Sequence, residues 1–114
     1  PFVLLSGDDA TSADAMLLGF DGVISVTANV VPAQMRALCD AARAGDDAAA
    51  RAADAPMAGL HSALFLDPNP IPVKWALHQM QRIGPGIRLP LVPMRAAFEA
   101  PVKTALADAG ALEN

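Results

Sequence analysis

The chain has 114 residues, one cysteine, a formal net charge of −4 and an apolar content of 54%, which is enough material for one domain. No apolar run approaches the ~18 residues that a membrane span needs, and an acidic chain with a single tryptophan gives little support to nucleic-acid binding. One cysteine excludes an internal disulfide, and Cys39, His61 and His78 share no metal-ligand spacing.

Two short apolar runs near the N-terminus predict strands. Residues 2–5 (FVLL) and 22–28 (GVISVTA) do not simply alternate between apolar and polar. Such runs are typical of strands covered on both faces, as in a parallel sheet. A short helix capped by Thr11 or Ser12 is expected between them. The order strand, helix, strand predicts one βαβ unit.

The pattern then changes to the helical period. Asn29 is expected to cap the next helix, Pro32 suits its first turn, and Gly45 is expected to end it. Its apolar stripe is predicted to consist of Met35, Leu38, Cys39 and Ala42.

A second helical pattern covers residues 48–66. Asp46 or Asp47 can cap this helix, and Pro56 is expected to kink it or split it in two. The apolar side chains expected along one face are Met57, Leu60, Leu64 and Phe65.

The stretch PNPIPVKWAL at residues 68–77 contains three prolines within five residues. A proline fixes its own φ and restricts the residue before it, so Asn69 and Ile71 are predicted to be extended. Pro72 then starts a helix that Gly84 ends, and the stretch is interpreted as a rigid elbow. An extended connector at 88–94 leads to a last helix at roughly 101–109. Side chains expected to face inward from these two helices are Val73, Ala76, Leu77, Met80, Ile83, Val102, Leu106 and Ala109.

Two covered parallel strands need neighbours on both edges, and the rest of this sequence predicts helices. The chain is therefore interpreted as the rear part of a larger α/β protein, such as a (β/α)₈ barrel of about 250 residues with a helical tail. The predicted division assigns residues 1–45 to the barrel and residues 46–114 to the helical region.

Four segments carry a resemblance to a known family: LLSGDDA at 4–10, GVISVTANV at 22–30, PNPIPVKWAL at 68–77 and RLPLVP at 88–93. In these segments and their spacing, the chain resembles the C-terminal portion of the dihydrodipicolinate synthases, also called 4-hydroxy-tetrahydrodipicolinate synthases, over all 114 residues. The resemblance implies that the chain is the last two βα units of a (β/α)₈ TIM barrel, with strands seven and eight, followed by a C-terminal helical tail.

The resemblance also implies a lyase of the class I aldolase type in lysine and diaminopimelate biosynthesis. Such enzymes condense pyruvate with aspartate semialdehyde through a lysine Schiff base, and a tyrosine relay moves protons. The lysine would lie on strand six, before Pro1, and the chain has no tyrosine. Its only lysines, Lys74 and Lys103, lie in the predicted helical tail. The 114-residue chain alone is therefore predicted to be inactive.

By resemblance, the backbone carbonyls of Gly7 and Ile24 would face the Schiff base and substrate, and Asp8 would belong to the lining of the active site. Asp9 is interpreted as a helix cap, with acid–base work by the paired carboxylates as the alternative. For Asp8, solvation at the rim and membership of an active-site water network both stay open.

The resemblance further implies a homotetramer, a dimer of dimers, with Asp14, Leu17 and Leu18 at a subunit contact. Ordinary packing of that helix on the sheet is the alternative. A cytoplasmic enzyme without metal or organic cofactor is expected. Two other functions stay open: another pyruvate-dependent aldolase, such as N-acetylneuraminate lyase or a keto-deoxy sugar-acid aldolase, and a non-catalytic structural fragment.

The remaining polar and reactive side chains are interpreted as structural. Cys39 is expected to pack in the core, His61 to be a structural histidine, and His78 to lie at the surface. Trp75 is either a packing anchor or an interface residue. Asn69 belongs to the rigid elbow, with a role near the site entrance as the weaker alternative.

Overall fold

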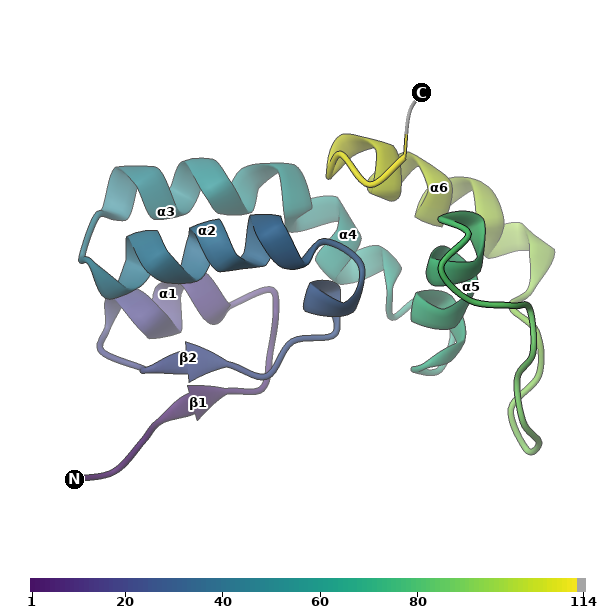
Figure 1. The fold of residues 1–114 in the computed structure, drawn as a ribbon, viewed down its shortest axis with the longest axis horizontal. Coiled ribbons are helices and arrows are strands. Elements are labelled where there is room, and N and C mark those ends of the chain that lie inside the picture. The colour runs from purple at the N-terminus through teal and green to yellow at the C-terminus, as the bar shows by residue number, and fades with distance from the viewer. Residues whose placement is uncertain (113–114) are drawn as a thin grey trace.

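A computed structural model describes residues 1–112 as a βαβ unit followed by a set of helices (Figure 1). None of the described helices is long and apolar enough to cross a bilayer. The elements are, in chain order, β1 (Leu5–Ser6), α1 (Ser12–Leu17), β2 (Gly22–Val23), η1 (Thr27–Asn29), α2 (Pro32–Arg43), α3 (Asp47–Asp54), η2 (Ala55–Met57), α4 (Ala58–Ala63), α5 (Ile71–Gln79), η3 (Ala96–Phe98) and α6 (Glu99–Asp108), where η denotes a 3₁₀ turn.

The two strands are parallel neighbours joined by α1. Leu5 lies opposite Gly22, and Ser6 lies opposite Val23. A parallel pair needs a crossover connection, which α1 supplies. The predicted βαβ unit is therefore confirmed.

Both strands are shorter than the sequence predicts, with two residues each. Residues 2–4 lead into β1 without joining a ladder, although the carbonyl of Leu4 accepts a hydrogen bond of 2.8 Å from the N–H of Asp21. The second strand stops early because the N–H groups of Val26 and Thr27 turn toward the carboxylate of Asp9. The chain then enters η1 instead of remaining extended.

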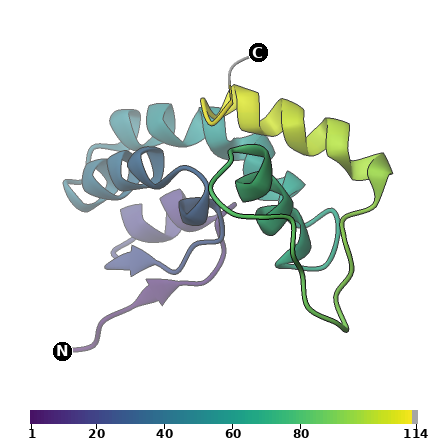
Figure 2. The same ribbon diagram turned by 45° about the vertical axis from the view of Figure 1, so that its right-hand side comes forward.

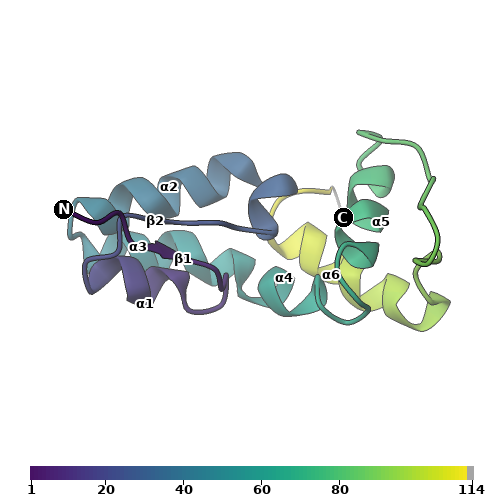
Figure 3. The same cartoon turned by 90° about the horizontal axis from the view of Figure 1, so that it is seen from below.

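Helices cover one face of the strand pair, and the other face is bare in the part of the chain that the structure describes. Figure 1 shows α1 and α2 on one side of the strands with α3 beyond them, and Figure 3 shows the strands from the uncovered side. Phe2 is 93% exposed and Ile24 is 71% exposed. Within the described residues only one face is covered, so coverage of the other face stays a prediction about a larger α/β protein.

Helix α2 begins and ends at the predicted residues, but its predicted cap is wrong. Pro32 occupies the first turn, and Val31 stands at the N-cap position without a side-chain hydrogen bond. Asn29 instead donates from its side-chain amide to the carbonyl of Val26 at 3.1 Å, inside the η1 turn. Gly45 has φ of +73° just past the helix, the left-handed conformation that glycine adopts most easily.

The predicted split at Pro56 is confirmed, because η2 separates α3 from α4. Asp46 caps α3 by accepting a hydrogen bond of 3.0 Å from the N–H of Ala49. Met57 and the two leucines of the predicted face are fully buried, whereas Phe65 is 55% exposed. Phe65 lies after the end of α4, where the chain turns and the helical face no longer continues.

The proline-rich stretch is a turn that runs directly into a helix, and not an extended elbow. Asn69 lies in the turn, and the N–H of Ile71 donates to the carbonyl of Pro68 at 2.8 Å. Ile71 is the first residue of α5, so proline follows it within the first helical turn, where a missing N–H costs nothing. The helix ends at Gln79, earlier than predicted, and leaves Ile83 38% exposed.

The last helix, α6, begins at Glu99, slightly before the predicted start, and Gly110 with φ of +76° ends it as predicted. The segment between α5 and α6 projects from the helices as a long loop (Figure 2). Arg95, near the end of this loop, donates from its side chain to the buried carboxylate of Asp67 at 2.8 and 3.2 Å. This pair ties the loop to the start of the proline-rich turn.

One core joins the helices to the βαβ unit. Helix α4 packs on α6, and α5 contacts both α6 and the η1 turn. The side chains that are fully buried include Leu38, Leu60, Leu64, Val102 and Leu106, with Met57 among them.

Candidate functional site

The carboxyl ends of β1 and β2 meet at one edge of the sheet, and polar side chains gather there. Asp9, which follows β1, is 4% exposed. Its carboxylate accepts hydrogen bonds from the hydroxyl of Ser25, from the N–H of Val26 at 2.9 Å and from the N–H of Thr27 at 3.2 Å. Asp9 therefore holds the end of one strand to the end of the other.

This geometry corrects the interpretation of Asp9 as the cap of the helix that follows it. The first turn of α1 bonds to Asp9 through its backbone carbonyl instead, which accepts the hydroxyl of Ser12 at 2.9 Å. Thr11 occupies the N-cap position but makes no capping hydrogen bond. The carboxylate of Asp9 bonds across the sheet edge because the donors of the residues that follow β2 lie there.

Asp8, unlike Asp9, is exposed. Its carboxylate accepts hydrogen bonds from the hydroxyl of Thr11 at 2.6 Å and from the N–H of Thr11 at 3.2 Å. The N–H of Asp8 donates to the hydroxyl of Ser6 at 3.2 Å. The two neighbouring aspartates thus have separate sets of partners, and Asp8 is the one that solvent or a ligand can reach.

Gly7 and Ile24 continue the strand register one residue beyond the last paired positions, which places them side by side. The N–H of Ile24 donates to the carbonyl of Ser6 at 2.8 Å. Among the described residues, no hydrogen bond ends on the carbonyl of Gly7 or of Ile24. Apart from the residues next to it in the chain, a Cβ at Gly7 would meet no atom of the described residues within 4 Å. The edge thus presents two adjacent free acceptors beside open space.

A buried histidine connects this edge to the helices. His61 on α4 is 4% exposed, and its Nδ1 lies 2.8 Å from the hydroxyl oxygen of Thr27, which is fully buried. Its Nε2 lies 3.0 Å from a carboxylate oxygen of Asp54 on α3. A neutral imidazole that donates from Nε2 to Asp54 accepts at Nδ1 from the threonine hydroxyl. The expectation of a structural His61 agrees with this burial.

The residues predicted at a subunit contact lie on and just after α1. Leu18 is 87% exposed, whereas Leu17 is partly buried against the core. Asp14 is exposed and forms an ion pair of 2.5 Å with Arg51 of α3, which also pairs with Asp47 at 3.1 Å. Leu18 is therefore the apolar side chain of this group that a partner could cover.

Neither of the other reactive candidates joins the strand-end cluster. Cys39 is partly buried on α2, where burial and, to a lesser extent, Asp40 raise the pKa of its thiol. A raised pKa leaves less thiolate, which fits packing better than nucleophilic chemistry. Lys74 lies on α5 and Lys103 on α6. No group of three potential metal ligands occurs among residues 1–112.

The comparisons with known proteins agree with the resemblance of the four sequence segments. Residues 1–109 match the model of the Dihydrodipicolinate synthetase family. The chain belongs to this family. Curated relatives include the 4-hydroxy-tetrahydrodipicolinate synthases of Thioalkalivibrio sulfidiphilus, 60% identical over 97% of this chain, and of Pseudomonas aeruginosa, 53% identical over 97% of this chain. The chain spans 38% of the length of each relative.

Solved structures of dihydrodipicolinate synthases have the same arrangement of elements. The enzyme of Acinetobacter baumannii, a chloride-inhibited synthase in complex with pyruvate, superposes with a TM-score of 0.94 and 49% identity. The match covers 97% of this chain and 38% of that one. A monomeric dihydrodipicolinate synthase variant superposes with a TM-score of 0.92 and 39% identity, over 97% of this chain and 37% of that one. The chain thus has part of the α/β fold of these enzymes.

Sequence reasoning about this family member missed the groups that hold the strand ends together. Ser25 and Thr27 follow the second strand, and Asp9 follows the first. A signal was present, because the carboxyl ends of parallel strands share one sheet edge. Hydroxyl groups after one strand and a carboxylate after its neighbour could therefore have been paired from the sequence. Nothing in the sequence pointed to Thr27 as the partner of His61, which lies 34 residues away.

Proposed function

We propose that this chain forms the last two βα units and the helical tail of a (β/α)₈ lyase that condenses pyruvate with aspartate semialdehyde in lysine and diaminopimelate biosynthesis. The observation that carries the proposal is the family match along residues 1–109. Relatives at up to 60% identity named 4-hydroxy-tetrahydrodipicolinate synthase, and the pyruvate complex of the Acinetobacter relative, support the same activity. These names favour the synthase over a sugar-acid aldolase.

In this proposal β1 and β2 are the seventh and eighth barrel strands, and their carboxyl ends line the active site. The free carbonyls of Gly7 and Ile24 accept hydrogen bonds from the Schiff-base nitrogen or from bound substrate, and Asp8 lies at the rim. A carbonyl orients these groups without adding a charge. The reacting lysine can then be kept neutral by its burial alone.

The Schiff-base lysine and the tyrosine relay belong to parts of the barrel other than these residues. Lys74 and Lys103 lie on helices, and neither follows a strand end. The iminium group formed by pyruvate and the lysine is itself the electron sink for the carbon–carbon bond, so the reaction needs no metal and no organic cofactor. We place the enzyme in the cytoplasm.

We further propose a homotetramer, a dimer of dimers, in which Asp14, Leu17 and Leu18 lie at a subunit contact. The exposure of Leu18, at 87%, supports this assignment. A monomeric variant among the structural relatives shows that tetramers are not universal in the family.

Borohydride reduction in the presence of pyruvate tests the proposal. The 114-residue chain should remain unlabelled in its intact mass and should form no product from the two substrates. A full-length synthase that carries this sequence as its C-terminal part should gain one pyruvate adduct on a peptide outside these residues. An adduct on Lys74 or Lys103 would overturn the placement of the nucleophile. Full-length protein without any adduct would overturn the Schiff-base mechanism.

A further inference from the structure

The positive charges of this acidic chain are concentrated in one segment. Residues 68–98 contain four of the eight Lys and Arg residues, namely Lys74, Arg82, Arg88 and Arg95, and none of the twelve Asp and Glu residues. The loop between α5 and α6 and the proline-rich turn therefore form a cationic region on a chain of net charge −4. A locally positive surface of this kind raises the concentration of anions around it.

Three of these four cations have no carboxylate partner in the described part of the chain. Arg95 is paired with Asp67 at 2.8 Å and lies 4.7 Å from the centre of the Phe98 ring. No ion pair within residues 1–112 includes Lys74, Arg82 or Arg88. Lys74 is also half-buried, and a partly desolvated ammonium attracts an anion more strongly than a fully hydrated one.

A cavity of about 350 Å³ lies between this lysine and the loop. Two cations and five apolar residues line it, and no acidic residue does. The lining residues are Pro70, Lys74, Ile87, Arg88, Leu89, Pro90 and Leu91. This size and this mixture of an apolar wall with a few polar groups are those of small-ligand sites, which begin at roughly 300 Å³. We refer to it as the loop cavity.

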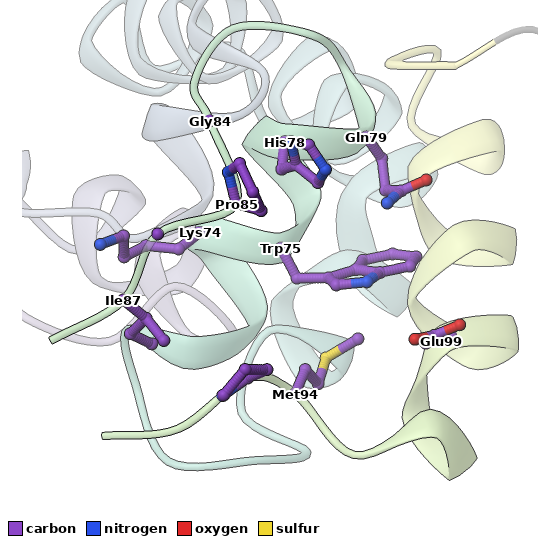
Figure 4. A pocket seen from close by; sticks show the side chains of 11 residues that line it. Lys74, Trp75, His78, Gln79, Gly84, Pro85, Ile87, Met94 and Glu99 are labelled. Carbon is purple, nitrogen blue, oxygen red and sulfur yellow. The ribbon is translucent and has the colours of Figure 1, made fainter. Parts of the chain in front are cut away.

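A second cavity of about 330 Å³ shares Lys74 and Ile87 with the loop cavity but has a different character. It contains Trp75, Met94 and the acidic Glu99. Figure 4 shows Glu99 and Lys74 on opposite sides of the Trp75 ring, with the ammonium of Lys74 directed away from the indole. Ile87, which lines both cavities, lies on the same side as that ammonium.

We propose that the loop cavity is a binding site for a small monocarboxylate with a compact apolar body. The carboxylate lies between Lys74 and Arg88, where it meets two positive charges and no negative one. The apolar body packs on Ile87, Leu89 and Leu91. The site is separate from the strand-end cluster of Gly7 and Ile24, and the inference does not depend on the proposed condensation activity.

Cyclohexanecarboxylate is a suitable probe, with cyclohexylmethanol as an uncharged molecule of the same shape. Titration of the isotope-labelled 114-residue chain should give saturable amide NMR shifts at Lys74 and over residues 87–91. Cyclohexylmethanol should bind about tenfold more weakly, because it lacks the charge-assisted hydrogen bonds. Added salt should weaken the binding of the carboxylate and leave that of the alcohol unchanged.

Substitutions locate the site. Lys74→Gln should weaken carboxylate binding about tenfold, whereas Lys103→Gln, which removes the only other lysine, should leave it unchanged. Arg88→Gln should weaken carboxylate binding severalfold. Because Arg88 is exposed, this variant should remain folded even if Lys74→Gln unfolds the chain. Equal binding of acid and alcohol, shifts that never saturate, shifts confined to the strand ends, or unchanged binding in both cavity variants would each overturn the proposal.

Discussion

Asp9 is the residue on which the geometry of the strand ends depends. It is 4% exposed, and its carboxylate accepts hydrogen bonds from Ser25, Val26 and Thr27. A buried carboxylate is tolerated when it is fully hydrogen-bonded in this way. Because its partners lie next to Ile24, Asp9 also positions one of the carbonyls that we assign to the active site.

The substitution Asp9→Asn should lower the free energy of unfolding of this chain by about 2 kcal/mol. The amide keeps the size of the carboxylate but loses its charge. Its carbonyl oxygen can still accept from the N–H groups of Val26 and Thr27, whereas its N–H₂ group replaces the oxygen that accepts from the Ser25 hydroxyl. Urea denaturation measures the difference. Asp8→Asn is the matched control, since Asp8 is exposed and its carboxylate accepts its hydrogen bonds from Thr11. Equal losses at the two positions would contradict the assigned role of Asp9.

Asp67 links stability to pH. The hydrogen bond from the Arg95 side chain lowers the pKa of the Asp67 carboxyl in the folded chain, against the effect of its burial. Because the pKa is lowered on folding, the ionised Asp67 stabilises the folded chain fully at any pH above the pKa that Asp67 has in the unfolded chain. This stabilisation is lost as the pH falls through the folded-state pKa.

Acidification should therefore destabilise the wild-type chain more than the Asp67→Asn variant. Between about pH 7 and about pH 2, the melting temperature of the wild type should fall further, because only the wild type loses a charged partner of Arg95. Thermal melts at both pH values measure this. Arg95→Gln should show the same reduced pH dependence as Asp67→Asn. An equal fall in melting temperature between the two pH values for the wild type and both variants would refute the link between Asp67 and the pH dependence of stability.

At the scale of elements, His61 joins η1 and α3 to α4. Its ring nitrogens lie 2.8 Å from the Thr27 hydroxyl and 3.0 Å from the Asp54 carboxylate. His61→Ala should lower the free energy of unfolding by about 3 kcal/mol, because it leaves a cavity and leaves the buried Thr27 hydroxyl without its partner. His78→Ala is the control, since His78 is only partly buried and its Nδ1 lies 3.1 Å from the carbonyl oxygen of Ile83. Urea unfolding should show a loss of less than about 0.5 kcal/mol in unfolding free energy for the control.

Two glycines in the helical part should respond in opposite directions to the same substitution. Gly45 ends α2 with φ of +73°, so Gly45→Ala should lower the unfolding free energy by about 1 kcal/mol. Gly59 lies within α4, and a Cβ there would meet only the Cβ of Ala105 at 4.0 Å. Gly59→Ala should therefore raise the unfolding free energy by about 0.5–1 kcal/mol. A loss at both positions would show that α4 has no room for the methyl group.

Sequence reasoning predicted the elements best where the deciding interaction is local. Pro32, Gly45, Asp46 and Pro56 act through their own φ or through a hydrogen bond to a nearby residue, and the structure confirms each. The errors arose where a distant group decides. Asp9, for example, turns to donors that lie 16 to 18 residues away instead of capping the next helix.

The candidate site was less predictable than the fold. The free carbonyls of Gly7 and Ile24 are backbone groups, and no side-chain chemistry marks them in the sequence. They entered through the family resemblance, and their contact with substrate stays a prediction. The cationic segment was readable in the charges of residues 68–98, but its cavity depends on how the loop packs against α5.

At the scale of the whole molecule, the sheet is unfinished within the described residues. The sheet consists of β1 and β2 alone, so each strand has one unpaired edge. Phe2, Val3 and Ile24 are between 71% and 93% exposed. An apolar strand with free N–H and C=O groups is a template for pairing with another chain. In the proposed enzyme the rest of the barrel would occupy this edge.

The isolated 114-residue chain should therefore self-associate through its sheet edge, and Val3→Lys should suppress this association. A lysine on an edge strand would have to lose its hydration in an edge-to-edge contact, which is why natural edges carry lysine. Sedimentation velocity at a low and a tenfold higher concentration measures the shift. Leu89→Lys, at a similarly exposed position of the loop, should have no effect, since Leu89 is 83% exposed and away from the sheet. The prediction is wrong if Leu18→Lys abolishes association and Val3→Lys does not. The contact would then run through the end of α1, as the proposed tetramer requires, and the sheet edge would be protected in some other way.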